Sequence, residues 1–173
     1  MNLNGDNIIL RPFCKEWAGV IKEWYYSGDY PRYFRHWSHI LTDDEFINFE
    51  QTFGKCLFLV KQGQPIGLIG ISNIMEVAKV CHLMTLIDKK HESQGLMLEA
   101  CFLFGRYLFC DLNYRKLVAN IVADDVATKR GLLRGGFIHE CTLIQECKVN
   151  GKVMDEDRLY MTDEMYFKLY GGA

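Results

Sequence analysis

This sequence of 173 residues lacks the features that mark several classes of protein. It has only three prolines and a net charge of −2, and it contains no linker, repeat or low-complexity segment. No apolar run reaches the length of a membrane span, and no signal peptide opens the chain. We therefore expect one domain over residues 1–173, in a cytoplasmic protein that binds neither nucleic acid nor membranes.

The cysteines likewise lack the spacing of a metal site or a disulfide framework. There are seven, an odd number, and no two are separated by only two residues; Cys141 and Cys147 lie six apart within an expected strand. Reduced thiols in the interior of an intracellular protein are the simplest interpretation, and we expect no metal.

The most informative segment present is IDKKHESQGLMLEA, residues 87–100. It has the pattern of a strand end, a polar loop, a glycine at Gly95 and then an apolar helix. A helix N-terminus offers unpaired N–H groups and partial positive charge, so this layout is typical of a pyrophosphate-binding turn. A plain turn before a helix is the alternative.

Hydrophobic periodicity and turn residues predict the other elements. We expect helices over Lys15 to Tyr26, Thr42 to about Phe53, Ser93 to about Phe109 and Asp124 to Arg134. We expect strands over 7–11, 56–61, 65–71, 79–88, 115–122, 137–149 and 153–161, the last two joined by the hairpin turn Asn150-Gly151. This order predicts an α/β fold with a mixed seven-stranded sheet and helices on both faces.

Five segments, in order, resemble the RimJ/RimL-like branch of the GNAT N-acetyltransferase superfamily. They are NIILRPF, GQPIGLIGI, IDKKHESQGLMLEA, DDVATKRGLLRGGF and KVNGKVMDEDRLYMTDEMY, which together cover Ile8 to about Tyr166. The resemblance implies a single-domain GNAT acyl-CoA N-acyltransferase fold with acetyl-CoA as co-substrate.

The family's pattern Arg/Gln-x-x-Gly-x-Gly/Ala binds the CoA pyrophosphate, and here it reads Glu92-Ser93-Gln94-Gly95-Leu96-Met97. Gly95 is retained, whereas Glu92 replaces a basic or amide residue and Met97 a small one. By resemblance, the cofactor-binding residues are Leu86, Ile87, Gln94, Gly95, Leu96, Met97, Leu98 and Asp125. Leu86 and Ile87 would offer backbone to the pantetheine arm where their strand splays from the next.

The resemblance also assigns catalytic roles. A glutamate often serves as base on the fourth predicted strand, and His82 aligns there; a histidine suits a base at neutral pH. The tyrosine acid of many relatives aligns with Leu132, which leaves Thr128 as a weak proton donor, and a backbone N–H near Ile87 would stabilise the oxyanion. The alternatives are a half-buried structural His82 and, for Asp125, an ordinary acidic pair at the N-terminus of a helix.

Relatives bind the acceptor between the first two helices and the last hairpin, where this chain is aromatic and acidic. The residues are Trp24, Tyr25, Tyr30, Tyr33, Trp37, Asp43, Asp44, Glu45, Glu156 and Asp157. Such a surface suits a cationic amine, although packing aromatics and a capped helix would look the same. The expected partner is a small amine or a protein N-terminus, and a homodimer is open.

Two functions from different classes follow. The first is transfer of an acetyl group from acetyl-CoA to a primary amine by direct attack. The second is a catalytically degenerate GNAT fold kept as a binding or structural subunit, which Glu92, Met97, Asp125 and the missing tyrosine favour. A related enzyme using another acyl-CoA is a third option, and a wider pocket would mark it.

Overall fold

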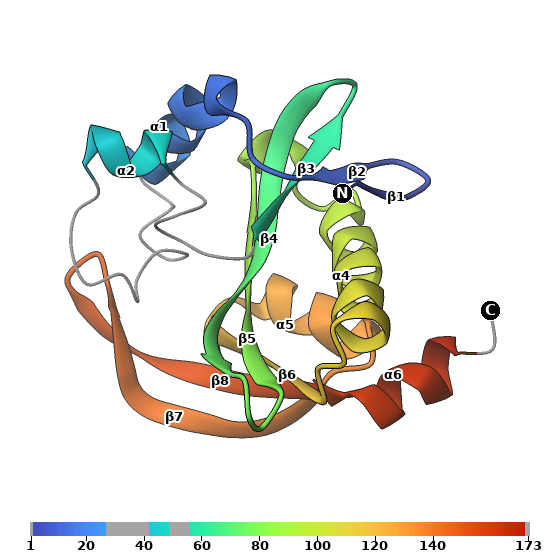
Figure 1. The fold of residues 1–173 in the computed structure, drawn as a ribbon. Helices are drawn as coiled ribbons and strands as arrows, with labels where there is room; N and C mark the ends of the chain where they lie inside the picture. Colours follow the sequence, from blue (N-terminus) through green and yellow to red (C-terminus); the bar gives the residue numbers. More distant parts are fainter. Residues whose placement is uncertain (1, 27–41, 49–55, 172–173) are drawn as a thin grey trace.

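The computed structural model describes residues 2–26, 42–48 and 56–171 (Figure 1). The strands are β1 (Leu3–Asn4), β2 (Ile9–Arg11), β3 (Cys56–Lys61), β4 (Gln64–Met75), β5 (Val80–Ile87), β6 (Lys116–Val122), β7 (Ile138–Val149) and β8 (Lys152–Thr162). The α-helices are α1 (Ala18–Tyr26), α2 (Asp43–Ile47), α4 (Leu96–Arg106), α5 (Val126–Arg134) and α6 (Asp163–Tyr170). Short 3-10 turns span Lys15–Trp17 and Lys89–His91, and α4 continues into a π-helical turn over Tyr107–Asp111.

All eight strands form one mixed sheet in the order β1-β2-β3-β4-β5-β6-β8-β7. Each pair of neighbours is antiparallel except β5 and β6, which are parallel. This confirms the predicted α/β fold with a mixed sheet. The seven predicted strands are all present, and the eighth is the two-residue β1, whose Leu3 pairs with Leu10.

Helices cover both faces of the sheet, as predicted (Figure 1). Side chains alternate along a strand, so each face has its own core. One core contains α1 through Ile21 and Trp24, packed on Phe58 and Leu68. The larger core holds α4, α5 and α6 against the opposite face, with Phe104, Leu132 and Tyr166 among its members.

Side-chain caps begin three of the helices. At α2, Thr42 is the N-cap, and it forms a reciprocal capping box with Glu45. Thr162 caps α6 by accepting from the Met165 N–H, and Asp125 caps α5. The predicted helix from Thr42 therefore starts as expected; residues 49–55, toward its predicted end, lie outside the described residues.

Two findings concern membrane spans and disulfides, neither of which the sequence predicted. Among the described residues, none of the helices has the length and apolar character needed to cross a membrane. All seven cysteines are free thiols.

Candidate active site

A wedge-shaped gap opens where the two parallel strands separate. β5 and β6 pair only at Val80 with Lys116, Cys81 with Leu117 and His82 with Val118. From Leu83 onward β5 pairs with β4 alone, while β6 pairs with β8 as far as Val122. The splay that the family resemblance implied is therefore present, and His82 and Leu83 mark its apex.

The hydrogen-bonding pattern decides which backbone groups of β5 face this gap. The Asp88 N–H donates to the Ile66 carbonyl (2.8 Å), which sets the register of hydrogen-bonded pairs between β4 and β5. Because these pairs alternate along an antiparallel ladder, the backbone groups of Leu83, Thr85 and Ile87 point away from β4 and toward β6. The Leu83 N–H still belongs to the pairing of His82 with Val118, so the Leu83 C=O and the N–H and C=O groups of Thr85 and Ile87 are those that face the gap.

The same alternation corrects one of the predicted cofactor contacts. Ile87 offers backbone to the gap, as expected, but the polar groups of Leu86 turn toward β4. A Cβ built on Gly67 of β4 would lie 2.4 Å from the Leu86 oxygen, which shows how closely that carbonyl approaches β4. The Leu86 side chain is buried in the core beneath α1. Sequence reasoning missed Leu83 and Thr85, because register and strand pairing are not visible in it.

The N-terminus of α4 lies just beyond the end of β5, and no side chain caps it. Gly95 precedes the helix in the left-handed conformation (φ 76°), which explains a glycine there. The first bond into the helix runs from the Glu99 N–H to the Gly95 carbonyl (3.1 Å). The N–H groups of Leu96, Met97 and Leu98 precede it and point out of the helix start, and a Cβ on Gly95 would meet nothing within 4 Å.

The polar turn before α4 is held by its own side chains. Asp88 accepts a bond from the Lys90 N–H (3.1 Å), and the Gln94 amide donates to the Lys90 carbonyl (3.1 Å). Lys61, at the end of β3, donates to the Gln94 side-chain oxygen (3.4 Å). Gln94 is thus engaged within the turn, and Lys61 joins Lys89 and Lys90 near it. No pattern in the sequence connects Lys61 with residues so far along the chain.

Two departures from the family pattern are placed differently from one another. The Glu92 side chain is exposed to solvent beside the turn. Met97 is half-buried and packs against the core beneath α4, so its extra bulk is directed into the protein. The helix start itself is left open by both residues.

The N-terminus of α5, by contrast, is satisfied by its own residues. Asp125 accepts bonds from the Thr128 N–H (3.1 Å) and from the Thr128 hydroxyl (2.8 Å). Asp125 is therefore the N-cap of α5, and the Thr128 hydroxyl proton points at its carboxylate. The parts of Asp125 in cofactor binding and of Thr128 as an acid stay predictions.

His82 lies at the apex of the gap on the face covered by α1 and α2. Its neighbours Cys81 and Leu83 belong to the core beneath α4, so alternation places the His82 side chain on the opposite face. Across the sheet it is aligned with Val118 on β6 and Tyr160 on β8. An acceptor reaching the apex from the α1 face would meet His82 first.

The residues predicted to line the acceptor side differ in where the structure places them. Trp24 is buried and its indole N–H points to Asp88 (3.4 Å), while Asp43 forms a salt bridge with Lys22. Tyr30, Tyr33 and Trp37 lie outside the described residues. Glu156 is fully buried on the α1 side of β8.

Asp157 does not belong to the acceptor side. It lies on the other face, where it accepts bonds from Lys129 (2.6 Å) and Thr142 (2.6 Å) and contacts His139 (3.0 Å). Burial by itself would raise the pKa of Asp157, but the three hydrogen bonds outweigh it and lower that pKa to about 2. This carboxylate fixes α5 to the sheet. In the sequence Asp157 is only the neighbour of Glu156, and nothing there shows that the two side chains lie on opposite faces.

Comparison with known proteins identifies the family to which this chain belongs. Residues 7–138 match the model of a family described as "Acetyltransferase (GNAT) domain". This chain belongs to the GNAT acetyltransferase family. The gap between β5 and β6 and the open start of α4 both lie within the residues that match this family.

Individual relatives of this GNAT chain are distant. It is 24% identical over 154 residues to "Probable N-acetyltransferase YjcK" of Bacillus subtilis, covering 87% of this chain and 80% of that protein. It is 23% identical over 111 residues to "Spermidine N(1)-acetyltransferase" of Vibrio cholerae, covering 63% of this chain and 64% of that protein.

Solved structures confirm the fold. The crystal structure of spermidine N-acetyltransferase from Vibrio cholerae in complex with CoA and spermine has a TM-score of 0.82 at 19% identity, over 94% of this chain and 99% of that one. A dodecameric structure of that enzyme gives 0.81 at 18% identity, over 96% and 99%. These likenesses establish the GNAT fold of this N-acetyltransferase family member.

No group of three or more His, Cys, Asp or Glu side chains is placed to hold a metal ion within residues 2–26, 42–48 and 56–171.

Proposed function

We propose that this protein transfers an acetyl group from acetyl-CoA to a primary amine, either a small amine or a protein N-terminus. The observation that carries the proposal is the wedge between β5 and β6 together with the uncapped start of α4 at its open end. One element offers unpaired backbone groups along a gap and the other offers them at a helix terminus, the two sites that a pantetheine arm and a pyrophosphate require.

The residues present fit such a co-substrate. The N–H groups of Leu96, Met97 and Leu98 would hold the pyrophosphate, with Lys89 and Lys90 supplying positive charge. The backbone of Ile87, Thr85 and Leu83 would pair with the pantetheine amides on the way to the apex. Acetyl-CoA supplies a thioester: its carbonyl carbon bonds to the amine nitrogen, the C–S bond breaks, and the sulfur leaves with the electron pair and takes up a proton.

His82 would take the proton that the amine must lose. Its position at the apex, on the α1 face, places it between the gap and the acceptor side, directly or through one water. The first backbone N–H beyond the apex, that of Thr85, would stabilise the developing charge on the carbonyl oxygen; Ile87, favoured by the sequence, lies closer to the helix start. Thr128 would return a proton to the sulfur only if its hydroxyl left Asp125.

Calorimetric titration with acetyl-CoA and CoA tests the proposal first. We expect saturable micromolar binding of one molecule per chain. Absence of binding at millimolar concentration would contradict the enzyme and support the degenerate GNAT fold, a binding or structural subunit. Acceptors are then screened by thiol release, beginning with spermidine and spermine because a relative is named for spermidine, followed by peptides with free N-termini.

His82→Ala tests the base. We expect turnover to fall by about a hundredfold, while acetyl-CoA affinity and the melting temperature stay within error. His82→Gln, which keeps a polar side chain without a titratable group, should behave alike. Turnover unchanged in both variants would remove His82 from the mechanism.

A further inference from the structure

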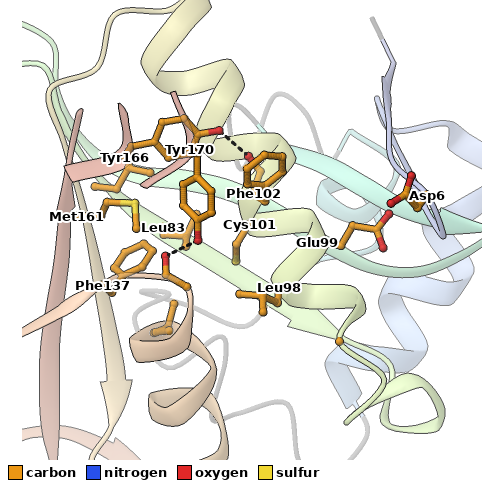
Figure 2. A pocket seen from close by; sticks show the side chains of 15 residues that line it. Asp6, Leu83, Leu98, Glu99, Cys101, Phe102, Phe137, Met161, Tyr166 and Tyr170 are labelled. Carbon is orange, nitrogen blue, oxygen red and sulfur yellow. Dashed lines mark hydrogen bonds between the residues drawn. The ribbon is translucent and has the colours of Figure 1, made fainter. Parts of the chain in front are cut away.

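An apolar cavity lies against the apex of the wedge, on the side opposite His82 (Figure 2). Its volume is about 410 Å³, and its walls come from β5, β6, α4, α5, β8 and α6, with Phe137 of the turn before β7. Leu83 and Leu117, which flank the point where β5 and β6 separate, both line it. The cavity therefore adjoins the place where the proposed thioester carbonyl would lie.

The lining near the apex is apolar, and its polar atoms are engaged. The Tyr166 hydroxyl donates to the Phe102 carbonyl (3.4 Å) and the Tyr170 hydroxyl to the Gly135 carbonyl (3.1 Å). These two bonds tie α6 to α4 and α5, so the rings line the space while the hydroxyls are occupied. The Cys101 thiol is neutral, because burial raises its pKa to about 12.

Charge is confined to the far end of the cavity. Of the 15 lining residues only Asp6 and Glu99 are acidic and none is basic. Glu99 accepts bonds from the Asn7 backbone N–H (2.9 Å) and side chain (3.0 Å), so it is committed to holding the N-terminal segment. Figure 2 shows Asp6 and Glu99 apart from Met161, Phe137 and Tyr166.

Leu132 of α5 is one of the residues that line this cavity. It is buried, and it occupies the position where many relatives by resemblance carry the tyrosine acid. A tyrosine there would place a hydroxyl in the space, whereas leucine leaves an apolar wall. Leucine at this position therefore contributes to the apolar lining and supplies no acid.

We infer that this enzyme also takes acyl donors whose unbranched chain is longer than acetyl, and that the longer chain lies in the cavity between α4, α5 and α6. The inference rests on the proposed function, because it uses the same thioester site. The reaction keeps the same balance: the amine nitrogen bonds to the carbonyl carbon, the C–S bond breaks, and the proton lost by the amine is matched by one taken up at sulfur. Only the group transferred is larger.

Calorimetry with CoA, acetyl-CoA, butyryl-CoA and hexanoyl-CoA tests the inference without any turnover. Each methylene buried in an apolar site strengthens binding by up to roughly fourfold. We expect hexanoyl-CoA to bind at least tenfold more tightly than acetyl-CoA, with butyryl-CoA between them. Equal or weaker binding of hexanoyl-CoA would overturn the inference and leave the proposed function standing; no binding of any of the four would overturn both.

Gly105→Leu tests whether the tighter binding of hexanoyl-CoA depends on this cavity. Gly105 on α4 lines it, and a Cβ there would lie 3.5 Å from the Tyr166 ring, an ordinary contact. The variant should bind acetyl-CoA within about threefold of the parent but lose the tenfold preference for hexanoyl-CoA. Gly105→Ala, a smaller change, should lose part of it.

Gly131→Leu is the matched control, because Gly131 lies within α5 and its Cβ would meet nothing within 4 Å. It should keep the full preference. A preference retained in both Gly105 variants, with melting temperatures showing that they are folded, would overturn the placement of the chain in this cavity.

Discussion

The helices α4 and α5 occupy equivalent places along the chain, but the N-terminus of α5 is capped by a side chain and that of α4 is not. Each helix follows one of the two parallel strands, β5 or β6, so both start at the open end of the wedge. α5 is capped by Asp125 and anchored through Lys129 to Asp157. α4 begins at Gly95 with no side chain on its first N–H groups.

The difference indicates where this fold leaves backbone N–H groups available to bind a ligand. Unpaired N–H groups at a helix start are normally satisfied by a cap, as at α2, α5 and α6. At α4 a left-handed glycine takes the place of the cap. The two helices should therefore respond to substitution differently: α4 through affinity for acyl-CoA, and α5 through stability.

Gly95→Trp should have the largest effect. The indole would cover the open N–H groups, and we expect acetyl-CoA affinity to fall at least a hundredfold by calorimetry. A non-glycine residue at this φ also costs about 1–2 kcal/mol of stability.

Gly151→Trp separates these two effects. Gly151, in the β7–β8 turn, has φ 81° and is equally open, so the backbone strain is matched far from α4. Its melting temperature should fall by a similar amount with affinity unchanged. Equal affinities in the two tryptophan variants would mean that the start of α4 holds no anion.

Asp157→Asn attacks the anchor of α5. Removing the buried charge that pairs with Lys129 should lower the free energy of unfolding by about 2 kcal/mol, measured in urea. Acetyl-CoA affinity should change by less than about threefold. Asp155→Asn, a neighbouring carboxylate that accepts from the Gln145 N–H, is the control and should cost less.

The contribution of Asp157 to stability should depend on pH, and acid titration measures the direction of that dependence. The folded pKa of Asp157, about 2, is below the value near 3.9 of an unfolded chain. Its contribution to stability is therefore complete above about pH 4 and is lost as the pH falls toward 2. The Asp157→Asn variant should lose less stability than the parent over that interval; an identical slope would contradict the assignment.

Asp125→Ala removes the cap of α5 and should cost about 1 kcal/mol of unfolding free energy. Asn is as good a cap and is the residue found in relatives by resemblance, so Asp125→Asn should keep stability near that of the parent. If α5 is satisfied internally, both variants bind acetyl-CoA within about threefold of the parent. A tenfold loss in the alanine variant, restored by asparagine, would instead place Asp125 on the cofactor.

Glu92→Gln should have the smallest effect. The exposed carboxylate beside the turn repels a pyrophosphate, so its removal should tighten acetyl-CoA binding by about threefold at low salt, and by less at high salt. Glu146→Gln, an exposed glutamate on β7, should leave affinity unchanged. Weaker binding in Glu92→Gln would show that Glu92 takes part in the site.

Much of this molecule was predictable because its signals are local. Apolar alternation located seven strands, and the acidic residues after Thr42 located the start of α2. The same reasoning missed α6, although Thr162 followed by Asp163 and Glu164 is the cap pattern that identified α2. β1 was missed because two residues carry no periodicity.

The candidate site was predictable only in part. Gly95 and the helix after it are adjacent in sequence, so their relation could be seen. Lys61 beside Gln94, the turn of Leu86 toward β4, and the placement of Asp157 on the far face all depend on strand register and pairing. A shift of one residue reverses the face on which a side chain lies, and composition does not fix that register.

The sequence by itself determined the order of elements, the left-handed glycine at the start of α4, the cap residues of α2 and α5, and the resemblance to the GNAT superfamily. These follow from steric and hydrogen-bonding preferences that act over a few residues. Only the tertiary structure decided that β5 and β6 part after His82, that Leu83, Thr85 and Ile87 face the gap, and that an apolar cavity adjoins its apex. Those features arise where strands and helices distant in sequence pack together, and no local preference specifies them.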